Sequence, residues 1–434
     1  ITAEQASAIE ANTAKVGITS DQAAAITANT AKTGITTDQA AAIETNTAKT
    51  GITADQAAAI TANTAKTGIT VDNQANTAVG SGALYLNTEG ANNTAIGHQA
   101  LYSNANAHGN TAVGNAALFS NTSGRRNTAS GTTALYANTT GNGNTAFGDN
   151  ALYANSNASW NTAVGAEALY FNSIGLGNTA SGYQALNRGG NYNTASGYKA
   201  LYLNSEDYNT ASGARALYFN SGTQNTASGY QALYSNTEGD NNTAVGSEAL
   251  YSNTTGTQNT ASGTTALYSN TTGFENTALG YQALFGNITG RGNIASGFQV
   301  LFSNTSGSYN TASGLWALYS NTSGESNTAF GRWTLTQNKT GSYNTAIGHY
   351  ADVTDGDFTN ATAIGASAKV NDSNKIRLGD TNVTVIEGQV AFSNASDERI
   401  KTDITETKYG LKTALSLKPV DYTMISNEQR NVGF

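Results

Sequence analysis

Apolar and polar positions return in the same order every 17 residues along most of the chain. Residues 225–241 read NTASGYQALYSNTEGDN, and the next units read NTAVGSEALYSNTTGTQ and NTASGTTALYSNTTGFE. Each unit keeps Asn-Thr-Ala at its start, Gly at its fifth position, Ala-Leu-Tyr near its middle and Asn two residues later. Repetition of this kind determines the class of fold, so it is interpreted first.

The Asn residues that begin the units recur from Asn76 to Asn344, and Ala361 takes the same place in the last unit. Most steps are 17 residues, while those ending at Asn193, Asn209 and Asn225 are 15, 16 and 16. Helical hairpin repeats need about 34 residues, and a Gly in every unit disfavours helix. Two short strands, NTAxG and ALYxN, joined by turns fit the length. The pattern predicts an all-β parallel β-solenoid of about 17 coils, stacked about 4.8 Å apart.

Two adjacent apolar residues, Leu233 and Tyr234 in the quoted unit, recur in nearly every unit. Successive residues of a strand face opposite sides, so we expect one ladder inside the coil and the other outside it. A long exposed apolar stripe usually marks an interface. The simplest partner is another copy of the chain, and, together with the resemblance given below, this favours a homotrimer over a monomer whose Tyr ladder binds sugars. A monomer that binds ice or glycan through its Thr rows would leave the Leu-Tyr pairs unexplained.

Residues 1–70 carry a different 17-residue repeat, such as ITSDQAAAITANTAKTG. Thr and Gln are spaced as capping boxes, Ala fills the middle, and Lys and Gly close each unit. The pattern predicts short helices in a coiled-coil-like stalk, with the Ile residues on the axis of a trimer. The alternative is that the solenoid continues here, because NTAKTG resembles NTAVG.

Composition excludes several classes of function. Charged residues are 12% of the chain, and its net charge of −8 forms no basic patch, so we expect no nucleic-acid partner. There is no Cys, and His98, His108 and His349 lack metal-ligand spacing, so we expect no metal and no cofactor. An acidic segment, DVTDGDF at 352–358, offers oxygen ligands for calcium, but a solvated turn is the favoured interpretation. No apolar run is long enough to insert into a membrane.

The C-terminal part departs from the repeat. Residues 366–395 alternate apolar and polar positions, which predicts a small β connector. SDERIKTDI, followed by LKPVDY and VGF, resembles the start of the endosialidase-type intramolecular chaperone and covers residues 396–434. The resemblance implies a fibre that folds as a trimer and then cleaves itself between Ala395 and Ser396. It also implies that Ser396 is the nucleophile and Lys401 its base. Because the match covers only the start of that domain, we expect the sequence to be part of a longer polypeptide.

The NTAxG…AL coils of residues 71–365 resemble the heads of trimeric autotransporter adhesins and the shafts of phage tail fibres. The resemblance covers about residues 75–365. The resemblance implies a structural, adhesive fibre in a virion tail or extracellular appendage. Its partners would be a surface glycan or protein receptor and, on the N-terminal side, other fibre or baseplate proteins. We expect no enzyme apart from self-cleavage. The alternatives are a polysaccharide-degrading tailspike and a bacterial surface trimeric adhesin.

The two residues after each Gly vary most between units, and variation on a rigid scaffold suits recognition. Aromatic side chains there can stack on sugars, although the simpler interpretation is that these residues are exposed and have no binding role. The candidate recognition residues are Tyr230, Gln231, Trp316, Trp333 and Tyr350.

Overall fold

The computed structural model describes residues 69–71, 74–387, 420–423 and 430–433. The chain divides into two units, Ile1–Asp380 and Thr381–Phe434. The first contains the repeat, and the second contains an antiparallel pair of strands, β23 (Val420–Thr423) and β24 (Arg430–Gly433). Each unit is described by itself.

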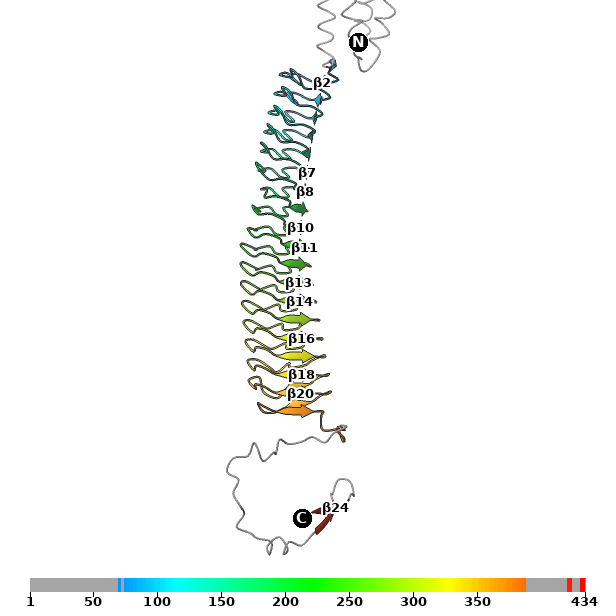
Figure 1. Cartoon of the computed structure of the whole chain (residues 1–434), viewed down its shortest axis with the longest axis vertical. Helices are drawn as coiled ribbons and strands as arrows, with labels where there is room; N and C mark the ends of the chain where they lie inside the picture. The colour runs from blue at the N-terminus through cyan, green and yellow to red at the C-terminus, as the bar shows by residue number, and fades with distance from the viewer. Residues whose placement is uncertain (1–68, 72–73, 388–419, 424–429, 434) are drawn as a thin grey trace, which may run out of the picture. The chain divides into compact units, whose positions relative to one another are not determined.

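The repeat folds as a parallel β-solenoid of about 18 coils, which confirms the predicted fold class. Coils stack one upon another, and each contributes one short strand to the same side of the stack (Figure 1). β1 (Ile69–Val71) pairs antiparallel with the first coil. The strands of the parallel sheet that follow are β2 (Thr77–Val79), β3 (Thr94–Ile96), β4 (Thr111–Val113), β5 (Thr128–Ser130), β6 (Thr145–Phe147), β7 (Thr162–Val164), β8 (Thr179–Ser181), β9 (Thr194–Ser196), β10 (Thr210–Ser212), β11 (Thr226–Ser228), β12 (Thr243–Val245), β13 (Thr260–Ser262), β14 (Thr277–Leu279), β15 (Ile294–Ser296), β16 (Thr311–Ser313), β17 (Thr328–Phe330), β18 (Thr345–Ile347), β20 (Thr362–Ile364) and β22 (Ile376–Leu378).

Each strand is only three residues long because the Gly after it cannot continue an extended chain. Gly246 follows β12 with φ +131°, a conformation that side chains rarely adopt. A Cβ on Gly246 would also lie 2.6 Å from the carbonyl oxygen of Gly263 in the next coil. Conformation and close stacking therefore both require Gly, and pairing stays in register, with Thr243 beside Thr260.

The ALYxN segment is not a strand in the regular coils, so the prediction of a second strand there is wrong. Gln231 and Leu233 have φ values of 51° and 51°, in the left-handed region, while the Ala between them does not. The segment still bonds to its neighbours, since the N–H of Leu233 donates to the carbonyl of Ala249 at 2.9 Å. The N–H of Gln231 donates in the other direction, to Ala214 at 3.0 Å. Hydrogen bonding between coils therefore continues without extended backbone.

One ladder of the Leu-Tyr pair lies inside the coil and the other outside it, as predicted, and the structure shows that the inner one is the Leu ladder. Leu233 is fully buried, and Tyr234 is half-buried. The left-handed turn at Leu233 separates the two side chains, rather than strand alternation. The strand Ala and the Ala before each Leu complete a narrow apolar core.

Two buried Asn ladders run beside this core. The Nδ2 of Asn253 donates to Asn236 Oδ1 at 2.7 Å and to the carbonyl of Gly256 at 2.9 Å. The Oδ1 of Asn225 accepts from the backbone N–H of Asn242 at 2.9 Å, in the next coil. Buried amides are thus satisfied by the adjacent coil, which makes each coil depend on its neighbours.

On the outer surface, the rings stack into what we call the aromatic ladder. Tyr234 and Tyr251 have ring centroids 5.1 Å apart and planes 3° from parallel. Burial, and then the neighbouring Tyr234 and Tyr268, raise the pKa of Tyr251 above its ordinary value of 10.0. The ladder has two runs: Tyr85, Tyr102, Phe119, Tyr136, Tyr153 and Tyr170, then Tyr202, Tyr218, Tyr234, Tyr251, Tyr268, Phe285, Phe302 and Tyr319.

The last coils differ from the others. β19 (Asp352–Val353) and β21 (Lys369–Val370) form the parallel second strand that the regular coils lack. Val353 and Val370 are buried in the core there. The main sheet continues past Gly365 to β22, which pairs with β20.

Most of the stalk predicted over 1–70 lies outside the described residues, and Ile69 and Thr70 within it begin β1. Within the described ranges, the structure contains no apolar helix of the length needed to cross a bilayer.

Candidate functional site

The second run of the aromatic ladder ends at Tyr319, because the next coil has Thr336 in the ring position. Tyr319 stacks on Phe302 with centroids 5.2 Å apart and planes 4° from parallel. At the other break in the ladder, Asn187 replaces the ring, and Phe171 packs edge-on against Tyr170 at 4.5 Å. Among the described residues, no ring stacks in parallel on Tyr319 from the Thr336 side.

Three of the five predicted recognition residues come together at this end. Trp316, Trp333 and Tyr350 occupy the same position in successive coils and each has positive φ. The rings of Trp316 and Trp333 meet edge to face, with centroids 4.4 Å apart and planes at 87°. The ring centroids of Trp333 and Tyr350 are 5.3 Å apart. Trp316 also meets the edge of Tyr319 at 6.4 Å. The aromatic side chains therefore connect the end of the ladder with the variable positions.

A hollow of about 310 Å³ opens where the ladder ends. We call it the ladder-end hollow, and no charged side chain lines it. Its size is at the lower end of the range of small-molecule sites, about 300 to 1,000 Å³. Its lining residues are Gln299, Trp316, Tyr319, Ser320, Trp333, Thr336 and Gln337.

Hydrogen bonds hold one wall of the hollow. The Nε1 of Trp316 donates to Gln299 Oε1 at 2.6 Å, and the Nε2 of Gln299 donates to Gln282 Oε1 at 2.7 Å. Trp333 differs, because its Nε1 is buried and has no hydrogen-bond partner. An unsatisfied buried donor costs about 1–3 kcal/mol. The Trp316 indole is thus fixed, while the Trp333 indole has an unused donor.

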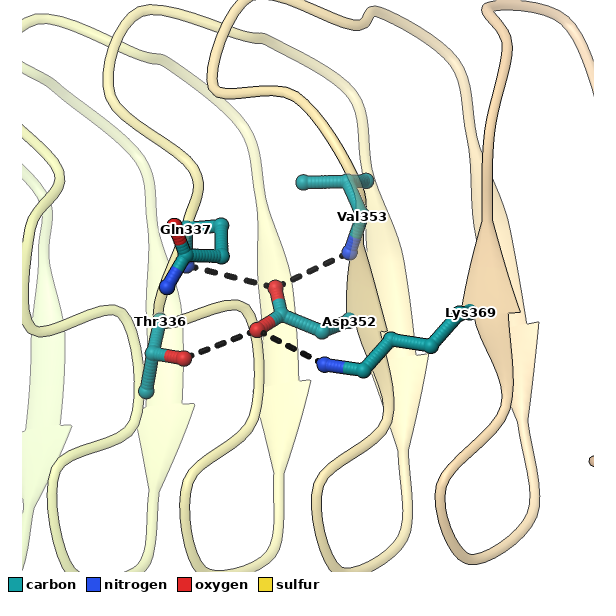
Figure 2. Close-up of polar contacts among 5 residues, drawn as sticks. All are labelled: Thr336, Gln337, Asp352, Val353 and Lys369. Carbon is teal, nitrogen blue, oxygen red and sulfur yellow. Dashed lines mark hydrogen bonds and ion pairs between the residues drawn. The ribbon is translucent and has the colours of Figure 1, made fainter.

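Asp352 bonds to two residues of the hollow's lining, Thr336 and Gln337 (Figure 2). Its carboxylate accepts from the hydroxyl of Thr336 at 2.8 Å and from the N–H of Gln337 at 3.3 Å. It also accepts from the N–H of Val353 at 2.9 Å and pairs with Lys369 Nζ at 3.4 Å. Burial raises the pKa of Asp352 above its ordinary value of 3.8, against the lowering effect of these partners. Asp352 therefore fixes two residues of the hollow without lining it.

The acidic segment does not gather its carboxylates at one point. Asp352 is engaged as described, Asp357 Oδ1 accepts from the hydroxyl of Thr340, and Asp355 Oδ1 accepts from the N–H of Asp357. In the part of the chain that the structure describes, no group of three or more His, Cys, Asp or Glu has the arrangement of a metal site.

The other predicted site residues lie elsewhere. Tyr230 is 50% exposed and Gln231 is half-buried, both on a coil away from the hollow. Ser396 and Lys401 lie outside the described residues. Sequence reasoning missed Gln299, Tyr319 and Thr336. The sequence did contain a signal for this site, because a Leu-Thr pair that ends at Thr336 stands where most coils have Leu-Tyr.

The outward side chains of the parallel sheet form a separate surface. The third residue of each strand points outward, and large apolar side chains occupy this position in many coils, on successive strands at Phe330, Ile347 and Ile364. Ser occupies it in the central coils, from Ser181 to Ser228. The exposed apolar residues at this position include Ile96, Val113, Phe147, Val164, Phe330, Ile347 and Ile364.

In a comparison with known families, a family model matches the C-terminal residues of the chain. The family model described as chaperone of endosialidase matches residues 396–434. No curated protein matches the chain. The match and the long β-solenoid together fit a phage tail-fibre or tailspike-like protein that carries an endosialidase-type chaperone domain.

Proposed function

We propose that the chain forms the shaft of a homotrimeric fibre in a phage tail or tail-like particle, and that this fibre attaches the particle to a host surface. The observation that carries the proposal is the match of residues 396–434 to the chaperone of endosialidase, in the same chain as a long solenoid. A rod of stacked coils suits a spacer, because its length grows with each repeat. Its N-terminal side would join other fibre or baseplate proteins.

The exposed sheet face supports association between copies of the chain. Phe330, Ile347 and Ile364 follow one another on successive strands at 45%, 44% and 40% exposure. A contiguous apolar stripe of this kind usually marks an interface. The half-buried aromatic ladder offers a second stripe. Copies packed along these stripes would cover apolar surface that the single chain leaves open to water.

Self-cleavage between Ala395 and Ser396 is part of the proposal. Ser396 would act as nucleophile and Lys401 as its base, because a serine needs a nearby base and a desolvated lysine can serve. Cleavage should release a fragment that begins at Ser396, as N-terminal sequencing would show. Ser396→Ala should block release and the matched Ser393→Ala should not. Release from the Ser396→Ala protein would contradict the assignment.

We also propose that the chain does not degrade polysaccharide. Purified protein incubated with surface polysaccharide of a bound strain should leave the polymer's size unchanged. Shortening of the polymer would favour a tailspike enzyme instead.

The test of the main proposal combines mass and attachment. Light scattering on the full chain with Ser396→Ala should give three times the chain mass of 44.6 kDa. Fluorescently labelled protein should bind intact cells of at least one strain in a bacterial panel. A monomer at micromolar concentration would overturn the trimer, and absence of binding across the panel would overturn attachment.

A further inference from the structure

We infer that the ladder-end hollow binds one neutral sugar residue of a surface glycan, stacked in the place that the aromatic ladder leaves empty. This inference rests on the proposed function and names the chemical class of ligand for one site on the fibre.

The shape of the site favours a flat ligand with an apolar face. Tyr319 is covered by Phe302 on one side, with planes 4° from parallel, and the position on its other side belongs to Thr336. Thr is too small to cover a ring. Trp316 and Trp333 contact each other edge to face, and both line the hollow beside this place. A pyranose ring presents C–H groups on its faces, which pack on aromatic rings, and it takes the place of the missing ladder ring.

The polar groups of the hollow favour hydroxyl groups on the ligand's edge. Gln337 brings an amide that both donates and accepts, and Ser320 and Thr336 bring hydroxyls. Asp352 accepts from the hydroxyl of Thr336 and from the backbone N–H of Gln337, so the Thr336 hydroxyl and the Gln337 backbone are fixed before a ligand arrives. A few fixed polar groups beside aromatic walls are typical of small-molecule sites.

The charge of the lining favours a neutral sugar over an acidic one. All seven lining residues are uncharged. A carboxylate or sulfate in the hollow would lose water without gaining a lining cation, which is unfavourable. A protein segment would need a longer groove than a hollow of about 310 Å³.

The three Trp residues of the chain make a direct test possible. The full chain is labelled with fluorotryptophan, and its fluorine NMR spectrum is followed while methyl glycosides of neutral hexoses and N-acetylhexosamines are added one at a time. At least one glycoside should shift the resonances of Trp316 and Trp333 in a saturable way. Trp160 is 64% exposed, packs over Gly143 on another part of the solenoid, and should not shift.

Variants separate stacking from general folding. Trp316→Ala and Trp333→Ala should each weaken glycoside binding by about tenfold, because each removes one aromatic contact of about 1.4 kcal/mol. The matched Trp160→Ala should bind as the unchanged chain does. Thr336→Tyr restores the missing ladder ring, so it should abolish binding while the thermal unfolding midpoint shows that the solenoid remains folded.

Each result decides the inference. If no glycoside shifts either resonance, or if all three resonances shift alike, the sugar site is wrong. If the Trp316 and Trp333 variants change the oligomeric mass and no glycoside binds, the patch is an interface between copies instead. Cell attachment without glycoside binding leaves the proposed function standing and removes only this site. Glycoside binding without cell attachment leaves the sugar site standing and removes the proposed role in attachment.

Discussion

Asparagine in the interior of the solenoid acts through an amide that donates and accepts at once. Asn253 donates to the amide oxygen of Asn236 and to the carbonyl of Gly256, and it is fully buried. Aspartate has the same shape but no donor when it is ionised. The identity of the residue is therefore fixed by hydrogen-bond direction rather than by size.

Asn253→Asp should lower the free energy of unfolding by about 3 kcal/mol or more, because a buried carboxylate would face two oxygen atoms. Urea unfolding measures the loss. Asn241→Asp is the matched control, since Asn241 is exposed, and it should change stability little. Equal losses for the two variants would contradict the role of the Asn ladder.

Asp352 gives the stability of the last coils a dependence on pH. Burial raises its pKa in the folded chain above the ordinary value of 3.8, so the folded state keeps the proton to higher pH than the unfolded state does. The stability contributed by this group is full below about pH 3.8 and is lost as pH rises through the folded pKa.

Asp352→Asn cannot titrate, so the free energy of unfolding of the unchanged chain should fall relative to this variant as pH rises from 3.8. Urea unfolding of both proteins across the acidic range measures the difference, with exposed Asp355→Asn as the matched control. A difference that grows in the opposite direction would mean that Lys369 and the hydrogen bonds outweigh burial.

At the scale of elements, each coil consists of one short strand and one segment with alternate left-handed residues. Leu250 has φ 53° and is fully buried, while Val245 ends the preceding strand. Side chains branched at Cβ favour strands and disfavour left-handed backbone. The two halves of a coil should therefore respond oppositely to β-branched residues.

Leu250→Ile conserves volume but should cost about 1–2 kcal/mol of unfolding free energy, because Ile is strained at positive φ. Ser262→Val is the control within β13, where Val should be tolerated as it is at Val245. Thermal or urea unfolding compares the two. A neutral Leu250→Ile variant would indicate that this segment becomes extended in solution.

At the scale of the whole molecule, stability is shared between neighbouring coils, and every regular coil has the same contacts above and below. Backbone bonds join Thr226 to Asn242 and Thr243 to Asn259 at 2.8 Å each, in identical geometry. In such an array, stability is close to a sum of coil and interface contributions. One whole coil should thus be removable.

Deletion of residues 242–258 removes one repeat and joins Asn241 to Asn259 in register. The shortened solenoid should keep its circular dichroism spectrum and a nearly unchanged thermal midpoint, since equivalent faces meet. Deletion of 242–249 is the control, because it places a strand against a Leu segment and should disrupt folding. Similar loss of structure in both proteins would contradict the repeat model of stability.

The sequence alone predicted the solenoid, its period and the division of the Leu-Tyr pair between the inside and the outside of the coil, because each depends only on a residue type returning at a fixed spacing. It also singled out Trp316, Trp333 and Tyr350 as variable aromatic positions. It did not predict the ladder-end hollow. That site depends on the replacement of a ring by Thr336 and on the direction in which side chains of neighbouring coils lean.

Tertiary structure decided what the repeat leaves open. Propensity favours a strand for ALYxN, but hydrogen bonds to both adjacent coils, from Leu233 to Ala249 and from Gln231 to Ala214, hold the segment with these residues at positive φ, and these contacts outweigh local preference. Likewise, the sequence shows Asp352 only as part of an acidic turn, and it is stacking of the coils that brings its carboxylate within hydrogen-bond distance of Thr336 and Gln337. The sequence by itself determined which residues stack, since identical units stack on themselves. Only the tertiary structure determined the direction of each side chain and the place where the absence of one ladder ring leaves a hollow.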